Sequence, residues 1–257
     1  MKFKFKKLIL KKNKSKLVCL TAYQKSIAKI LDKYCDLILV GDSLANVLYG
    51  MKNTHKLSLE IMANHAKSVK LGVKSTPVVV DMPKNTYNNI KDALKNAKKL
   101  MKFSKCDAVK IESNYYNYKI IENLVKSNIP VMGHIGYTPQ YKSKFKVQGS
   151  SITDEKKLIN DALNIEKAGA FGIVIECVTS KTTKKITKIL KIPTIGIGSS
   201  VNCDGQILVT DDMMGLSGFY PKFVKKYQNL NKIIEKSVQK YRSDVLKSIF
   251  PKKKNSY

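Results

Sequence analysis

The sequence predicts a single α/β domain built as a (β/α)8 barrel, and three observations point to this fold class. Short, uninterrupted apolar runs recur along the chain, and such runs are typical of parallel strands that are covered on both faces. Amphipathic helical segments alternate with these runs, which favours a parallel sheet. Several of the runs end in a side chain that can bind a metal ion or move a proton. Barrel enzymes keep such groups at the carboxyl ends of their strands.

Eight segments have the composition of buried strands. Three of them open with a proline, which is tolerated at the first position of a strand because that residue need not donate to the sheet. In chain order, the expected strands lie at residues 17–23, 37–43, 77–83, 108–112, 130–138, 172–178, 193–200 and 207–209.

Helical periodicity follows most of these strands. After Ser58, for example, apolar residues recur with the 3.6-residue period until Gly72, and Thr86 is expected to cap the helix that follows the third strand. The expected helices lie at residues 26–34, 59–72, 87–101, 117–127, 153–168, 180–190 and, as a long amphipathic helix near the end of the chain, 230–245.

Length and composition fit one catalytic domain. A chain of 257 residues with 43% hydrophobic residues can bury a substantial core. We expect a basic N-terminal extension (residues 1–16), a barrel domain (17–250) and a Lys-rich tail (251–257). No apolar run approaches the roughly 18–20 residues that a membrane span needs, and the apolar centre of the first sixteen residues is short for a signal peptide. We therefore expect a cytoplasmic protein.

The formal charge of +29 raises the possibility of a nucleic-acid-binding protein. Arg242 is the only arginine among the 48 basic residues, however, and arginine is the residue that reads phosphate and guanine through two hydrogen bonds. We therefore expect no specific nucleic-acid partner. The five cysteines form no CxxC pair and indicate neither a disulfide framework nor a zinc site.

Three acids, Asp42, Asp81 and Glu112, end the second, third and fourth expected strands. Neighbouring strands would bring these carboxylates together, where two charges ~4 Å apart repel by about 4 kcal/mol at an effective dielectric constant of 20. A cation relieves this repulsion, and oxygen ligands favour Mg²⁺. For any one of these acids, a helix cap or a salt bridge is the more common role, but three at successive strand ends favour a metal site.

Lys110 and Glu176 are the next candidates. Lys110 lies two residues before Glu112, so both side chains should point into the barrel, where the lysine could bind a substrate carboxylate or form a structural ion pair. Glu176 ends the sixth strand. Among apolar strands its pKa would rise, which suits a general base, although an ion pair with a helix lysine is the alternative.

His134 lies in the fifth expected strand between two glycines, Gly133 and Gly136, that could leave room for a ligand close to the backbone. It could line an active site or be a buried histidine with its hydrogen bonds satisfied. The sequence favours neither reading.

Several longer motifs resemble one enzyme family. GDSL at 41–44, VKIE at 109–112, GHIGYTPQ at 133–140 and CDGQILV at 203–209 are similar to the ketopantoate hydroxymethyltransferase family, and further matches extend over nearly the whole chain. The resemblance implies a (β/α)8 barrel that transfers a hydroxymethyl group from 5,10-methylenetetrahydrofolate to 3-methyl-2-oxobutanoate. The product would be ketopantoate, the first intermediate of pantothenate biosynthesis. It also implies Mg²⁺ and a homodecamer or another homo-oligomer.

The resemblance assigns roles residue by residue. It implies Asp42, Asp81 and Glu112 as the metal ligands, Asp42, Ser43, Asp81 and Lys110 as the keto-acid contacts, and Glu176 as the base. Three positions depart from the family pattern, which usually has an aromatic residue, an Ala-Gly pair and a histidine there. In this chain they are Lys84, Ser199-Ser200 and Asp211. We expect these departures to affect contacts with the folate and not the reaction class.

Two other functions fit parts of the pattern. One is a Mg²⁺-dependent keto-acid lyase or mutase of the phosphoenolpyruvate mutase and isocitrate lyase type, which would act without folate. The other is a basic barrel that binds nucleic acid and has lost catalysis, and the intact set of acids with Lys110 and Glu176 argues against it.

Overall fold

A computed structural model of the chain describes residues 3–113, 117–142, 144–218 and 220–257. The chain divides into two compact units, residues 1–209 and residues 210–257. The first unit holds the barrel. The expected boundaries at residues 16 and 250 stay predictions.

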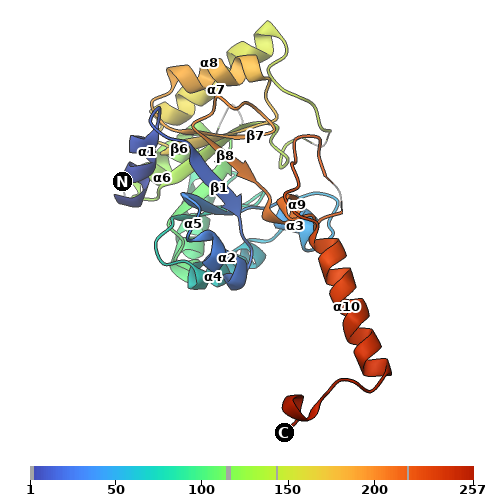
Figure 1. Ribbon diagram of the computed structural model, residues 1–257. Coiled ribbons are helices and arrows are strands. Elements are labelled where there is room, and N and C mark those ends of the chain that lie inside the picture. The colour runs from blue at the N-terminus through green and yellow to red at the C-terminus, as the bar shows by residue number, and fades with distance from the viewer. Residues whose placement is uncertain (1–2, 114–116, 143, 219) are drawn as a thin grey trace. The chain divides into compact units, whose positions relative to one another are not determined.

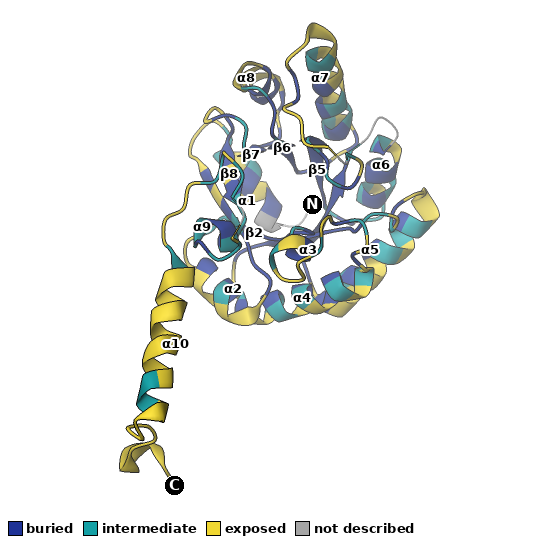
Figure 2. Ribbon diagram, turned by 90° about the vertical axis from the view of Figure 1, so that its right-hand side faces the viewer, coloured by how far each residue is buried: buried dark blue, intermediate teal, exposed yellow. Residues whose placement is uncertain are grey.

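The first unit is a closed barrel of eight parallel strands, so the predicted (β/α)8 class is confirmed (Figure 2). Each strand pairs with its neighbours in the sequence, and β8 closes the ring by pairing with β1 at Leu17 and Gly205. The strands are β1 (Leu17–Thr21), β2 (Leu37–Val40), β3 (Val78–Asp81), β4 (Ala108–Glu112), β5 (Val131–Gly136), β6 (Gly172–Glu176), β7 (Thr194–Ile197) and β8 (Gly205–Leu208).

Helices surround this ring (Figures 1 and 2). The segment between β7 and β8, all of which the structure describes, contains no helix. The helices of this unit are α1 (Phe3–Lys11), α2 (Lys25–Leu31), α3 (Leu44–Val47), α4 (Leu59–Gly72), α5 (Ile90–Ser104), α6 (Tyr118–Lys126), α7 (Ile152–Lys167) and α8 (Ser180–Ile189).

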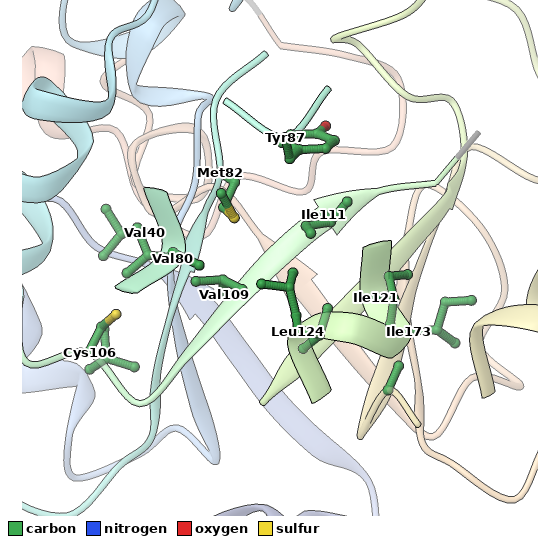
Figure 3. Packing of buried hydrophobic residues seen from close by; sticks show 14 of the residues in the cluster. Val40, Val80, Met82, Tyr87, Cys106, Val109, Ile111, Ile121, Leu124 and Ile173 are labelled. Atoms are coloured by element: carbon green, nitrogen blue, oxygen red, sulfur yellow. The ribbon is translucent and has the colours of Figure 1, made fainter. Parts of the chain in front are cut away.

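Strand residues alternate between two cores because successive side chains point to opposite faces of a sheet. One alternate set, including Val80, Val109 and Ile173, packs against the helices (Figure 3). The other set, including Val79, Ala108 and Met132, fills the barrel interior. Lys110 and Glu112 share the inward parity of Ala108, so the strand that packs the interior also carries charged groups to its carboxyl end.

The first sixteen residues contribute to this interior core. Helix α1 buries Phe5 and Leu8, and the ring of Phe5 stacks on Phe171 with centroids 4.1 Å apart. Phe171 directly precedes β6, so α1 packs against the amino ends of the strands. The basic segment expected to be an extension therefore supplies apolar side chains that the barrel buries.

One expected helix cap is wrong. Asn89, and not Thr86, caps α5, because the Asn89 side chain accepts a hydrogen bond from the Asp92 N–H at 2.8 Å. The Thr86 hydroxyl instead donates to the Pro83 carbonyl at 2.6 Å within the preceding turn. Ser58, after which a helix was expected, caps α4 by accepting a hydrogen bond from the Ile61 N–H.

The second unit contains α9 (Thr210–Met213), α10 (Leu230–Leu246) and a short 3-10 helix (Lys253–Asn255). The expected long helix is confirmed as α10. None of its residues, all of which the structure describes, is buried. The apolar residues that made it amphipathic are exposed, among them Ile233, Ile234, Val238, Tyr241 and Val245.

Candidate active site

The carboxyl ends of β2, β3 and β4 bring three predicted site residues into contact. Asp81 and Lys110 are neighbours in the strand register, and Lys110 Nζ lies 2.6 Å from Asp81 Oδ1. Both side chains are almost fully buried, with 6% and 3% of their surface exposed. The backbone N–H of Asp42, just after β2, donates to Asp81 Oδ2 at 3.0 Å. Each oxygen of Asp81 therefore has a partner from a neighbouring strand.

Glu112, His134 and Glu176 form a second row, from β4, β5 and β6. His134 is opposite Glu112 in the register. Its Nδ1 lies 3.7 Å from Glu112 Oε1, and its Nε2 lies 3.2 Å from Glu176 Oε2. Neither contact is a hydrogen bond, so both ring nitrogens and Glu112 Oε1 are buried without one. The histidine thus separates the two carboxylates.

Gln140, in the segment after β5, links these groups. Its side-chain amide donates to Asp42 Oδ2 at 2.8 Å and to the Met82 carbonyl at 3.0 Å. Its carbonyl oxygen accepts from the Tyr87 hydroxyl at 2.5 Å. Its backbone N–H donates to Glu112 Oε2 at 3.0 Å. Because Gln140 is 1% exposed, protein groups satisfy its hydrogen-bonding capacity.

Burial and like charges raise the pKa values of the site acids. Burial, and then the Asp81 charge, raise the pKa of Asp42 to about 7. Burial and the Asp42 charge hold the pKa of Glu112 well above its usual value. Burial also raises the pKa of Glu176 to about 7. Burial alone would lower the pKa of Lys110, but Asp81 and Asp42 outweigh it and raise that pKa to about 12. One lysine therefore faces several acids, and negative charge is in excess.

His134 is uncharged at neutral pH, because burial and the nearby charge of Lys110 hold its pKa well below the usual value. The interpretation of its flanking glycines needs correction. A Cβ at Gly133 would lie 2.5 Å from Ile165 Cγ2 of α7, and one at Gly136, which has a φ of +97°, would lie 2.1 Å from the Glu176 carbonyl oxygen. The glycines therefore allow close packing of α7 and β6, and not the approach of a ligand.

The acids partly fit a divalent cation. No group of three His, Cys, Asp or Glu side chains within the described ranges stands ready to hold a metal ion. Asp81 is engaged by Lys110, which explains why the three acids do not face one point. The pKa of Glu112, in contrast, is raised by burial and then by the charge of Asp42, and Glu112 Oε1 is buried without a hydrogen bond. A buried, unpaired carboxylate oxygen beside a second acid suits Mg²⁺.

Ser43 and the two departing serines also have defined places. The Ser43 hydroxyl, at the start of α3, lies 2.8 Å from the Tyr23 hydroxyl. The Ser199 hydroxyl bonds that of Thr183 at 2.6 Å, and Ser200 bonds Ser180 at 2.9 Å. The departure at 199–200 therefore ties the loop after β7 to the first turns of α8.

The sequence analysis assigned no role to Gln140 or Tyr87. Both lie in segments after a strand, and strand periodicity does not predict the direction of a side chain there. Gln140 ends the GHIGYTPQ motif, and that motif is the one signal that could have indicated it.

A closed parallel barrel with a buried acid, lysine and histidine cluster at the carboxyl ends of its strands defines a (β/α)8-barrel enzyme. The family model described as ketopantoate hydroxymethyltransferase matches residues 2–253, and the chain belongs to this family. The predicted family, and with it the predicted class of enzyme, a hydroxymethyltransferase, are confirmed.

Relatives support the same assignment. The chain is 51% identical, over the full length of both proteins, to the 3-methyl-2-oxobutanoate hydroxymethyltransferase of Pelagibacter ubique. It is 48% identical to that of Clostridioides difficile, over 94% of this chain and 90% of the relative. None of the helices in the described ranges is both long and apolar enough to cross a membrane.

Solved structures share the fold at low identity. A phosphoenolpyruvate phosphomutase from Streptomyces platensis superposes with a TM-score of 0.64 at 12% identity, over 95% of this chain and 87% of the other. A phosphonopyruvate hydrolase in complex with oxalate and Mg²⁺ gives 0.61 at 11% identity, over 98% and 93%. These similarities concern the barrel fold alone.

Proposed function

We propose that this chain transfers a hydroxymethyl group from 5,10-methylenetetrahydrofolate to 3-methyl-2-oxobutanoate, giving ketopantoate. The observation that carries the proposal is the buried cluster of Asp42, Asp81, Lys110 and Glu112 opposite Glu176, in a chain 51% identical over its full length to a relative that bears this name. The cluster offers one cation and an excess of acids, which suits a substrate that carries a carboxylate and a keto oxygen and binds with a divalent ion.

Asp42 and Glu112 would hold Mg²⁺, and Asp81 would join them directly or through water. When bound, Mg²⁺ acts as a Lewis acid toward the keto oxygen of the substrate. Lys110, which keeps its proton at neutral pH, compensates the substrate carboxylate. Ser43 and the strand-end acids limit how the keto acid can lie.

Glu176 would be the base. A pKa near 7 leaves its carboxylate able to accept a proton at neutral pH and to release it again. The uncharged His134, 3.2 Å from Glu176 Oε2, contributes no positive charge that would lower this pKa. Glu176 removes the proton from the carbon next to the keto group. That carbon then bonds to the folate methylene carbon as one of its two C–N bonds breaks. Water replaces the second nitrogen and supplies the hydroxyl group of ketopantoate, and the two released nitrogens take up the protons that give tetrahydrofolate.

The Glu176→Gln variant tests the base. It should bind 3-methyl-2-oxobutanoate with nearly unchanged affinity, measured by calorimetry, while exchange of the substrate's α-proton in D₂O, followed by NMR, falls to the uncatalysed rate. Glu155→Gln is the matched control, because Glu155 pairs with Lys185 on the surface. Exchange at the wild-type rate in Glu176→Gln would remove Glu176 from the base role.

One product assay separates the proposal from the lyase or mutase alternative. Ketopantoate should form only when 3-methyl-2-oxobutanoate, methylenetetrahydrofolate and Mg²⁺ are all present. Cleavage or rearrangement of a keto acid without folate would favour the alternative. The cytoplasmic location and the homodecamer stay predictions. Light scattering of the purified protein measures the oligomer.

A further inference from the structure

Gln140 occupies an unusual place among the site residues, because one residue contacts groups from three strand ends. Its side-chain amide reaches Asp42 after β2 and Met82 after β3, and its backbone N–H reaches Glu112 at the end of β4. Gln140 itself follows β5. A single residue that follows β5 therefore contacts groups at the ends of the three neighbouring strands that carry the proposed metal acids.

The contacts determine the orientation of the amide. Both N–H bonds of Nε2 point at oxygen acceptors, and Oε1 faces the Tyr87 hydroxyl, which donates to it at 2.5 Å. Turning the amide over would place Oε1 against Asp42 Oδ2 and the Met82 carbonyl, two acceptors with no proton to share. The two acceptors thus set the direction in which Gln140 donates, and the Tyr87 hydroxyl keeps the amide in that orientation by donating to Oε1. Figure 3 shows Tyr87 and Met82 at one end of the buried cluster and Cys106 at the other.

The segment that carries Gln140 is itself held in place. The Tyr141 N–H closes a turn by donating to the Thr138 carbonyl at 3.0 Å. The carbonyl of Pro139 lies 2.9 Å from His55 Nε2. Thr138 and Gln140 are both buried. The amide is therefore attached to a fixed backbone, and its hydrogen bonds hold the two acids in fixed positions.

Gln140 uses one oxygen of each of two acids and leaves the other. It binds Asp42 Oδ2 and Glu112 Oε2, while Glu112 Oε1 remains buried without a hydrogen bond. Each acid is already held by one oxygen. It can therefore present its second oxygen to a cation without a further loss of side-chain conformational freedom when the cation binds. Partners that orient metal ligands in this way commonly change metal affinity by a factor of about 10–100 when they are removed.

We propose that Gln140, oriented by Tyr87, is a positioning residue that prepares Asp42 and Glu112 for a divalent cation. This inference rests on the proposed function, in which these acids bind Mg²⁺. Gln140 touches neither substrate nor the cation. It acts only through the two carboxylates.

Binding of Mn²⁺ to the metal-free protein, measured by electron paramagnetic resonance, tests the proposal without any turnover. The Gln140→Met variant keeps the length of the side chain and the backbone N–H but loses both amide donors. Its dissociation constant for Mn²⁺ should rise about tenfold or more. Tyr87→Phe removes only the hydroxyl that orients the amide and should raise the constant by a smaller factor, about threefold.

Gln148→Met is the matched control. Gln148 lies in the same β5–α7 segment and is also buried, but its side chain bonds Lys142 and the Lys146 carbonyl and no site acid. The affinity of the Gln148→Met variant for Mn²⁺ should equal that of the wild type. A thermal unfolding temperature near that of the wild type would show that each variant is folded. If Gln140→Met does not fold, the Mn²⁺ affinity of Tyr87→Phe decides the question.

Two failures can be told apart. If the wild type binds Mn²⁺ and the folded Gln140→Met and Tyr87→Phe variants bind it equally well, this inference is wrong and the proposed function stands. If the wild type binds no Mn²⁺, the metal requirement of the proposed function fails, and this inference fails with it.

Discussion

Two buried lysine–aspartate pairs lie at opposite ends of the barrel. Lys12 and Asp204, at the amino ends of the strands, are 2.7 Å apart with 7% and 4% of their side chains exposed. Lys110 and Asp81, at the carboxyl ends, are 2.6 Å apart with 6% and 3% exposed. Distance and burial are therefore nearly equal, and the difference lies in the surrounding groups.

The Lys12 pair is surrounded by neutral partners. Asp204 also accepts hydrogen bonds from the backbone N–H and the hydroxyl of Thr194, at 2.8 and 3.0 Å. Lys12 also donates to the Thr187 carbonyl at 3.1 Å. One positive charge meets one negative charge, and neutral dipoles satisfy the remaining positions. Such an arrangement offsets the cost of burying the two ions but offers nothing to a ligand.

The Lys110 pair is instead surrounded by further acids. Asp42 and Glu112 both raise the pKa of Lys110, in addition to Asp81. The lysine does not compensate all of them, so like charges add to burial in raising the pKa values of Asp42 and Glu112. The comparison teaches how to read a buried ion pair at a strand end. If the surrounding groups leave an excess of one charge, the pair marks a binding site. If the surrounding charges balance, the pair is a structural contact.

The largest expected effect is on catalysis. Lys110→Met removes the cation that faces the substrate carboxylate and the acids, and loss of one partner of a buried, hydrogen-bonded charge pair commonly costs about 2–5 kcal/mol of binding free energy. The kcat/KM for 3-methyl-2-oxobutanoate should therefore fall by a factor of about 10²–10³ or more. Lys126→Met, which breaks an exposed pair on α6, is the control. A loss below tenfold in Lys110→Met would contradict the role given to this lysine.

The amino-end pair should respond in the opposite way. Lys12→Met leaves Asp204 buried without its cation, and the free energy of unfolding, measured in urea, should fall by about 3 kcal/mol. Turnover per folded molecule should stay within about twofold of the wild type, because no site residue touches this pair. A loss of turnover as large as that of Lys110→Met would erase the distinction between the two ends.

The smallest expected effect is on the pH dependence of stability in metal-free protein. The pKa values of Asp42 and Glu176 rise to about 7 on folding, from about 4 in the unfolded chain, and that of Glu112 rises as well. Between these values the folded state binds more protons than the unfolded state, so the stability decreases as pH rises from about 4 to 7. Lowering the pH from 7.5 to 5.5 should thus increase the free energy of unfolding.

His134 opposes this trend. Its lowered pKa means that the unfolded chain takes up a proton below about pH 6.5 that the folded chain does not. Three acids outweigh one imidazole, so the net change keeps its sign. Saturating Mg²⁺ should abolish the gain at low pH, and Asp42→Asn should reduce it. A flat profile in metal-free protein would show that the acids do not carry uncompensated charge.

Local pattern was enough to predict most of the fold. The run Leu37–Val40 and its counterparts are apolar on every position, which only a strand covered on both faces requires, and their number and spacing predicted the closed barrel. The two-residue period also predicted that Lys110 and Glu112 share a face. Less regular segments were harder: Thr86 and Asn89 are both good helix caps, and the surrounding turn selects between them.

What the sequence alone determined, then, is the set of strands, the acids at their ends, and the family to which the chain belongs. Only the tertiary structure decided which group each acid contacts. It paired Asp81 with Lys110, placed His134 between Glu112 and Glu176, and brought Gln140 to Asp42, ninety-eight positions away. Strand periodicity fixes the face on which a side chain lies because it follows from backbone geometry. Contacts between loops depend on how the closed barrel brings strand ends together, and no local pattern encodes that.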